Sequence, residues 1–231
     1  MEGDDGRPEF AFGRIPALTA SEALAYVGKL IEHENAASSG RVLLASDNAD
    51  GAGDFAASSS QLEDRIGGAF AISSISLDEL SPLDARAALK AELEAGSYWL
   101  NYYGHGAAAR FAAAPLLHRS DVATIDHGDQ LPIVTSLTCS VGRFEVPGMV
   151  SLAEPLTLAS DRGAIAVLAP TGTGFHAVSE RIGERFFAEA FEGRATTLGE
   201  AWVEAVRSFD GPVEQLGVYQ LFGDPAVPLQ P

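Results

Sequence analysis

Hydrophobic residues in this chain follow two patterns, one typical of amphipathic helices and one typical of buried strands. The helical pattern begins at Thr19-Ala-Ser-Glu22, which has the form of a capping box. The apolar face that follows it comprises Ala23, Tyr26, Val27, Leu30 and Ile31. Short apolar runs that end in polar residues, such as RVLLASD at 41–47, predict strands that are buried on both faces.

The two patterns alternate along the chain. Helices are predicted near residues 19–35, 55–66, 82–95, 150–161, 176–192 and 197–208. Strands are predicted near 41–47, 69–77, 97–104, 131–139 and 163–170. This order predicts an α/β protein with a mostly parallel central sheet that is covered by helices on both faces. We find no repeat, linker or low-complexity segment, so residues 1–231 are expected to form a single three-layer α/β/α domain.

Composition narrows the classes of function. With 231 residues, 46% of them hydrophobic, the chain can bury a full core. The 15 basic and 32 acidic residues give a net charge of −17, which argues against nucleic acid as a partner. No apolar run approaches the roughly 20 residues that span a bilayer, and the acidic start is not a signal peptide. The single cysteine excludes an intramolecular disulfide and a multi-cysteine zinc site.

Polar residues follow the predicted strands at the carboxyl edge of the sheet, where open α/β sheets bind ligands. Asp47, His105 and Cys139 each end a different strand. A lone cysteine is often a small buried hydrophobe, and His105 could be a turn residue. However, a thiol needs a nearby base to form the thiolate, and the glycine after His105 leaves the Gly106 amide free to face a substrate. We therefore expect His105 and Cys139 to approach each other at this edge.

The loop DNADGAGDF, residues 47–55, is rich in acidic residues and glycine. Asp47, Asp50 and Asp54 could gather a structural calcium ion, although their spacing does not match an EF-hand loop. An Asx turn is the commonest use of aspartate among glycines. The residues alone leave both interpretations open.

Other motifs are incomplete. The segment PTGTGFHA at 170–177 lacks the third glycine of a dinucleotide-binding loop and the lysine of a P-loop. No serine occupies a GxSxG elbow, so a serine hydrolase finds no support. The remaining histidines match no metal-ligand motif; they are His33, His118, His127 and His176.

Several segments together resemble, in order, the catalytic domain of the gingipain family of cysteine peptidases, which has a caspase-like fold. They include VLLASDNADGAGDF, LNYYGHG, LTCSVGRFEVPGMVSLAEPLTLASDRGAIAVLAPTG and YQLFGDPAVPL. The resemblance extends from about residue 7 to residue 229. Its most specific features are the GHG motif, the cysteine at a strand end and the terminal GDP, at the spacing of the family.

The resemblance implies a role for each candidate residue. Cys139 would be the nucleophile and His105 the base, and the amides of Gly106 and Cys139 would form the oxyanion hole. Asp47 lies where the family places the acid that orients the histidine.

The resemblance also implies a substrate pocket. Asp54 falls near the position where arginine-cleaving members keep the acid that binds the basic side chain, and Asp50 is the second choice. The loop after Pro170 would border this pocket, with an aromatic lid near Phe175 or His176.

The implied function is that of a cysteine endopeptidase, a thiol protease that cleaves protein or peptide substrates after Arg or Lys without a required cofactor. Two alternatives stay open: a transpeptidase of the same family, and a catalytically silent binding or assembly domain. The resemblance further suggests a secreted or cell-surface bacterial protein whose usual upstream subdomain is not in this chain. The oligomeric state cannot be predicted from the sequence.

Overall fold

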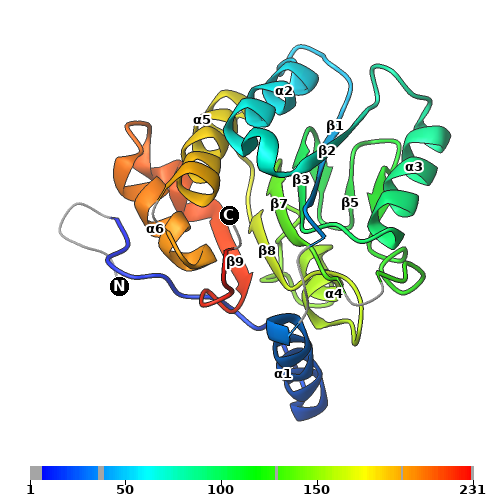
Figure 1. The fold of residues 1–231 in the computed structure, drawn as a ribbon, viewed down its shortest axis with the longest axis vertical. Helices are drawn as coiled ribbons and strands as arrows, with labels where there is room; N and C mark the ends of the chain where they lie inside the picture. The colour runs from blue at the N-terminus through cyan, green and yellow to red at the C-terminus, as the bar shows by residue number, and fades with distance from the viewer. Residues whose placement is uncertain (1–6, 36–38, 128–129, 194, 230–231) are drawn as a thin grey trace.

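A computed structural model describes residues 7–35, 39–127, 130–193 and 195–229, so the first six residues of the acidic start lie outside the described part (Figure 1). The helices are α1 (Ala20–Asn35), α2 (Phe55–Ile66), α3 (Pro82–Glu94), α4 (Ala153–Leu158), α5 (His176–Phe187) and α6 (Leu198–Ser208). Short 3-10 or π turns are η1 (Gly67–Ala69), η2 (Ala188–Glu192) and η3 (Val213–Val218). None of the helices described is long and apolar enough to cross a membrane.

A six-stranded sheet forms the centre of the molecule, in the order β2-β1-β3-β7-β8-β9. Its strands are β1 (Arg41–Ser46), β2 (Ala71–Ser76), β3 (Trp99–Tyr103), β7 (Ile133–Leu137), β8 (Ala166–Pro170) and β9 (Tyr219–Gly223). The first five strands of this order are parallel, and β9 runs antiparallel to β8. Ser46 pairs with Tyr103, and Tyr103 pairs with Leu137. The loops after β1, β3 and β7 therefore leave the sheet side by side.

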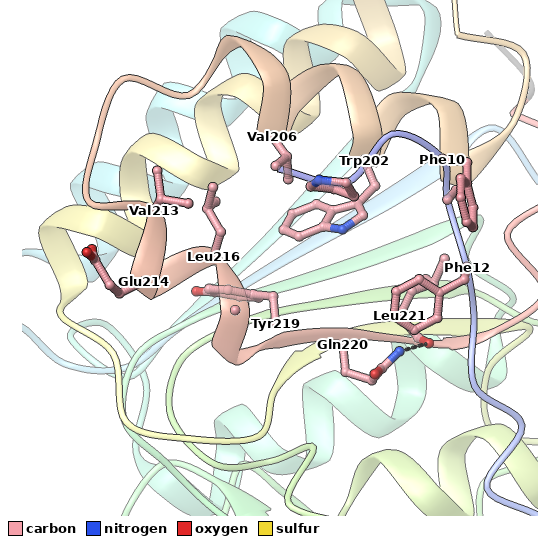
Figure 2. Close-up of a pocket in the computed structure, with 13 residues that line it drawn as sticks. Phe10, Phe12, Trp202, Val206, Val213, Glu214, Leu216, Tyr219, Gln220 and Leu221 are labelled. Carbon is pink, nitrogen blue, oxygen red and sulfur yellow. Dashed lines mark hydrogen bonds between the residues drawn. The ribbon is translucent and has the colours of Figure 1, made fainter. Parts of the chain in front are cut away.

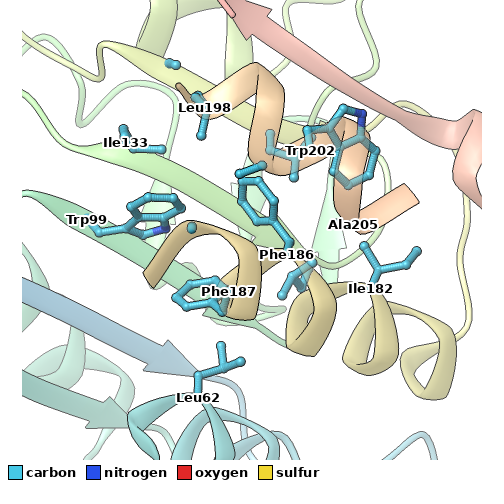
Figure 3. Close-up of a cluster of buried hydrophobic side chains, with 14 of the residues drawn as sticks. Leu62, Trp99, Ile133, Ile182, Phe186, Phe187, Leu198, Trp202 and Ala205 are labelled. Atoms are coloured by element: carbon cyan, nitrogen blue, oxygen red, sulfur yellow. The ribbon is translucent and has the colours of Figure 1, made fainter. Parts of the chain in front are cut away.

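Each central strand contributes to two hydrophobic cores, because successive side chains point to opposite faces. On β3, Trp99 and Tyr103 enter the core that contains residues of α2, α5 and α6. Figure 3 shows Trp99 within this core. Leu100 and Tyr102 enter the other core, with residues of α3 and α4. The three-layer α/β/α architecture predicted from the sequence is confirmed.

Helix α1 begins and ends where the sequence predicts. Its capping box is formed, because Thr19 Oγ1 accepts a hydrogen bond from the Glu22 amide at 3.2 Å and the Glu22 carboxylate accepts one from the Thr19 amide at 2.9 Å. The predicted apolar face is only partly buried. Tyr26 is fully buried, but Val27 is 44% exposed and Ile31 is 58% exposed. The prediction that these last two residues face the core is wrong.

Lys29 takes their place on the inner face of α1, where it is 1% exposed. Its ammonium group donates hydrogen bonds to the carbonyl oxygens of Leu156, Thr157 and Arg162, at 3.3, 2.9 and 2.9 Å. A buried lysine needs such partners, because burial without them is costly. The inner face of α1 therefore buries a lysine beside Tyr26.

A second, small sheet was not predicted. Its strands, β4 (Gly106–Ala107), β5 (Arg110–Phe111) and β6 (Leu117–His118), are antiparallel and follow directly after His105. Phe111 is buried and stacks on Tyr102, with ring centroids 4.2 Å apart. This contact attaches the small sheet to the carboxyl end of β3.

Candidate active site

Cys139 lies two residues beyond the end of β7 and is half-buried. The next residue, Ser140, has φ +59°, a left-handed conformation that is uncommon for residues other than glycine. Its amide donates a hydrogen bond to Gly172 O at 2.9 Å. The Cys139 Sγ atom lies 3.5 Å from the amide nitrogen of Gly174 and 3.6 Å from its carbonyl oxygen. The turn that carries the thiol is thus held against the loop after β8.

His105 is held by a rigid turn after β3. Gly104 has φ +153°, and a Cβ atom there would lie 2.4 Å from both Asp47 and the Tyr102 hydroxyl, so a glycine is required. The His105 amide donates to Asp47 Oδ2 at 3.1 Å, and the His105 carbonyl accepts from the Tyr102 hydroxyl at 2.8 Å. The backbone of His105 is therefore fixed on both sides.

The imidazole ring of His105 is paired with Asp50. Its Nε2 atom lies 2.8 Å from Asp50 Oδ2, and its ring meets Phe55 edge-on with centroids 5.3 Å apart. Two hydrogen bonds lower the pKa of the Asp50 carboxyl: the larger effect comes from the Ala52 amide, and the next from His105. Because Nε2 faces Asp50, Nδ1 is the ring nitrogen left for a thiol.

Asp47, which the resemblance marked as the orienting acid, contacts the backbone of His105 in this structure. It is 4% exposed, and its carboxylate accepts hydrogen bonds from the backbone of His105 and, at 3.4 Å, from the Tyr102 hydroxyl. No hydrogen bond joins it to the imidazole among the residues described. The structure thus brings Asp47 to the backbone of His105 and Asp50 to its ring.

His105 and Cys139 line one cavity of about 50 Å³ at the carboxyl edge of the sheet. Gly104, Gly174 and His176 contribute to the same cavity. This volume is enough for one or two water molecules.

Gly106, the predicted oxyanion donor, lies directly against Cys139. A Cβ atom at this position would lie 2.5 Å from Thr138 Oγ1 and 2.6 Å from Cys139 O. Only glycine allows the backbone to approach the nucleophile turn this closely.

Asp54 caps helix α2. Its Oδ1 atom accepts a hydrogen bond from the Ala57 amide at 2.9 Å, and its φ and ψ angles of −98° and 93° are those of an N-cap residue. This is the local use of aspartate that the sequence left open, and it engages one of the two carboxylate oxygens.

The two candidates for the lid differ in position. Phe175 is 71% exposed and does not line the cavity described above. His176 is half-buried and packs edge-on against Phe55 and Tyr103, with centroids 4.6 and 5.8 Å away. Burial lowers the pKa of the His176 imidazole. Of the two, only His176 is a wall of the cavity.

Sequence reasoning missed a polar group behind His176. His176 Nε2 lies 3.0 Å from Ser58 Oγ, and Ser58 Oγ lies 2.6 Å from Glu180 Oε1. Glu180 follows His176 by one helical turn, so helix periodicity offered a signal for this pair. Ser58 carries no motif and could be placed only by the fold.

The three aspartates of the acidic loop are engaged in separate contacts. The carboxylates of Asp47, Asp50 and Asp54 bind three different partners, namely the His105 backbone, the His105 ring and the Ala57 amide. Within the described ranges, no group of three or more His, Cys, Asp or Glu side chains could hold a metal ion.

A larger hollow of about 710 Å³ lies elsewhere, between the N-terminal segment, α6 and β9 (Figure 2). It is lined mainly by apolar side chains, including Phe10, Trp202 and Leu216. Its lining contains no cysteine and no histidine. The hollow therefore lacks the thiol and the imidazole of a Cys-His pair, despite its size.

Comparison with solved structures identifies the fold. The Arg-specific cysteine proteinase gingipain R (RgpB) superposes with a TM-score of 0.85 and 18% identity, covering 99% of this chain and 57% of that chain. The complex of Porphyromonas gingivalis RgpB pro- and mature domains gives the same TM-score and identity, with 99% and 58% covered. A structure described as a protease gives a TM-score of 0.72 at 15% identity, with 92% and 54% covered. This chain thus spans less than two thirds of these proteins, and the likeness shows the caspase-like fold of gingipain.

The sequence comparisons add the family. No curated protein sequence matches this chain. The family model of peptidase family C25, however, matches residues 1–230, which is nearly the whole chain. This match confirms the resemblance to gingipains and the predicted enzyme class, a cysteine-type peptidase: the chain belongs to peptidase family C25.

Proposed function

We propose that this chain cleaves peptide bonds with Cys139 as the nucleophile and His105 as the base. The observation that carries this proposal is that both residues, from loops after neighbouring strands, line one cavity at the carboxyl edge of the sheet. His105 would take the thiol proton, and the thiolate would attack the carbonyl carbon. The imidazolium would then give its proton to the leaving amine, and water would hydrolyse the thioester.

The amides of Gly106 and Cys139 would stabilise the oxyanion of the tetrahedral intermediate. The close approach of Gly106 to Cys139 supports this role, because two amides can serve one oxygen only when they are near each other. One such donor is typically worth about a hundred- to a thousandfold in rate.

Asp50 would orient the imidazole, in place of Asp47. A carboxylate on Nε2 selects the tautomer whose Nδ1 is free to accept the thiol proton, and it stabilises the imidazolium that forms. Asp47 would act indirectly, because it holds the His105 backbone.

The substrate would carry Arg or Lys immediately before the cleaved bond. Asp54 is the first candidate for the acid that binds it, since only one of its oxygens caps α2 and Asp50 is engaged by His105. Glu180 adds a carboxylate behind His176, and the net charge of −17 favours cationic substrates. Since the cavity is only about 50 Å³, His176 would have to move to admit such a side chain.

Kinetics on four matched peptides test this function. The peptides carry Arg, Lys, Leu or Asp before the cleaved bond, and wild type is compared with Asp54→Asn. We expect Arg or Lys to be preferred by wild type and the preference to shrink in the variant. Equal rates for Leu and Arg in wild type would refute the specificity. Mass spectrometry of the products separates hydrolysis from transfer to an added amine, which is the transpeptidase alternative.

A Cys139→Ala variant is the control for every rate. Cleavage that persists in this variant would come from a contaminant or from another nucleophile. Protein or peptide substrates and a location outside or on the surface of a bacterial cell belong to the same proposal, and family membership supports them.

A further inference from the structure

Arg110 lies on β5, five residues after His105, in the small sheet that follows the active-site turn. It pairs with Ala107 on β4 and with His118 on β6. Paired residues of antiparallel strands point to the same face, and the next residue, Phe111, points to the core. Arg110 therefore belongs to the outer face of the sheet, where it is partly exposed.

Arg110 differs from every other lysine and arginine in the described residues. The others form ion pairs with acids, donate to backbone carbonyls or, in one case, lie over a phenylalanine ring. The Arg110 side chain has no hydrogen bond, ion pair or ring contact within this part of the chain. With 32 acidic residues against 15 basic ones, an unpaired arginine is unusual here.

A second uncompensated charge lies beside it. The Arg119 guanidinium donates to the carbonyl oxygen of Val150, which is a neutral group. The Arg119 amide donates to Ala109 O at 2.8 Å, so its backbone is part of the same hairpin. The small sheet and the residue that follows it thus carry two positive charges that no acid in the described residues neutralises, in a protein of net charge −17.

The small sheet lies next to His105 and Cys139. Gly106, at the start of β4, lies against Cys139, and the His105 carbonyl accepts a hydrogen bond from the Ala112 amide at 2.9 Å. Paired residues have Cβ atoms about 5 Å apart, so Arg110 begins about 5 Å from Ala107, two residues beyond His105.

The chemistry indicates which part of a substrate passes this sheet. His105 would deliver a proton to the leaving amine, so the amine nitrogen must lie next to His105. The residues that follow the cleaved bond are attached to that nitrogen. They leave the centre on the side of His105, where the chain continues into β4 and β5.

We propose that Arg110 binds a carboxylate of the substrate within the first three residues after the cleaved bond, so that the enzyme selects acidic residues there. This proposal rests on the peptidase function proposed above. A guanidinium can bind a carboxylate through two parallel hydrogen bonds, which adds selectivity to the attraction. Arg119 strengthens the local positive field without contacting the ligand.

The test uses peptides with arginine before the cleaved bond and Asp, Asn or Lys at each of the three following positions in turn. At one of these positions, wild type should cleave the Asp peptide about fivefold faster in kcat/KM than the Asn peptide, as a partly exposed ion pair allows. The Lys peptide should be slowest. Arg110→Gln should remove this ranking, and Arg110→Glu should reverse it. Higher salt should weaken it in wild type.

Arg207→Gln is the matched control, because it removes the same charge from α6. Equal rates for Asp and Lys peptides in wild type, or a ranking that survives in Arg110→Gln, would overturn the proposal. Loss of the ranking in the control would show that net charge alone produces it.

A binding measurement separates this proposal from the peptidase function. The same peptides are titrated against Cys139→Ala by fluorescence anisotropy, with and without Arg110→Gln. If no peptide is cleaved by wild type, the peptidase function fails, but a carboxylate preference that depends on Arg110 would still uphold the subsite. Binding that ignores the carboxylate would refute it.

Discussion

Ionisable side chains gather at both ends of the central strands, at the carboxyl edge and at the amino-terminal edge of the sheet. The two groups differ in their exposure to solvent and in the partners of their charges. At the carboxyl edge, His105 and Asp50 are 49% and 42% exposed and lie 2.8 Å apart. Near the amino-terminal ends of β7 and β8, Lys29 and His127 are 1% and 3% exposed. Among the residues that the structure describes, Lys29 donates hydrogen bonds to carbonyl oxygens and to no carboxylate.

The difference appears in the pKa values. Burial lowers the pKa of Lys29 to about 7, and burial together with the nearby Lys29 lowers that of His127 to about 4. At the carboxyl edge, hydrogen bonds from Ala52 and His105 lower the pKa of Asp50 and keep it ionised. An exposed, paired group can exchange protons with a substrate, whereas a buried cation without an acid partner mainly makes stability depend on pH.

The largest expected effect is at the carboxyl edge. Cys139→Ala should lower kcat by about a thousandfold or more, because the nucleophile is lost. The folded state should be little changed, since a small residue replaces a half-buried thiol. Fluorogenic peptide kinetics and thermal unfolding measure the two effects. Retained turnover would refute the nucleophile, and a variant that cannot fold would indicate that the thiol is a core residue.

Replacing each of the two aspartates with asparagine, one at a time, separates their contributions at the carboxyl edge. Asp50→Asn should lower kcat/KM by about ten- to a hundredfold with little change in Tm, because it removes the partner of the imidazole from an exposed site. Asp47→Asn should lower Tm more, because a buried acceptor of hydrogen bonds from Asn48, Tyr102 and His105 is weakened. The opposite pattern, with Asp47 controlling kcat and Asp50 controlling Tm, would restore Asp47 as the orienting acid.

At the amino-terminal edge, substitutions should change the free energy of unfolding rather than the rate of cleavage. Lysine has a pKa of about 10.4 when unfolded and Lys29 about 7 when folded, so between these values the unfolded state binds more protons. The unfolding free energy of wild type should therefore rise from pH 7 toward pH 10. Lys29→Met should flatten this rise in urea unfolding at several pH values.

Lys90→Met is the control for this experiment. It removes a lysine that lies 4.0 Å from Asp121 on the surface of α3. This variant should keep the rise in unfolding free energy above pH 7. A wild-type curve without such a rise would mean that the burial of Lys29 carries no energetic cost.

The smallest effect is expected at His127. Its folded pKa of about 4 lies below the usual 6.5, so stability should fall as the pH drops from 6.5 toward 4. His127→Gln should lose part of this acid sensitivity, which chemical denaturation at pH 5 and pH 7 can measure. An unchanged difference between the two pH values would assign the acid sensitivity to other groups.

Much of the fold could be predicted because its signals are local. Three signals each depend on only a few neighbouring residues. They are the capping box of α1, the β-branched and apolar runs of β1, β7 and β8, and the glycines around His105. The two-residue strands β4 to β6 could not be predicted, since so short a strand has no periodicity. The polar inner face of α1 could not be predicted either, because Lys29 finds its carbonyl partners more than 120 residues away.

The sequence by itself determined the class of fold and the family, and it predicted that His105 and Cys139 lie at one edge of the sheet because each follows one of the neighbouring strands β3 and β7. Only the tertiary structure decided which aspartate meets the imidazole. Asp47 and Asp50 are three residues apart in one loop, and their positions depend on contacts with Tyr102, His105 and Ala52. It also decided that the Arg110 side chain has no partner among the residues that the structure describes. Pairing depends on distances between side chains, which no local pattern records.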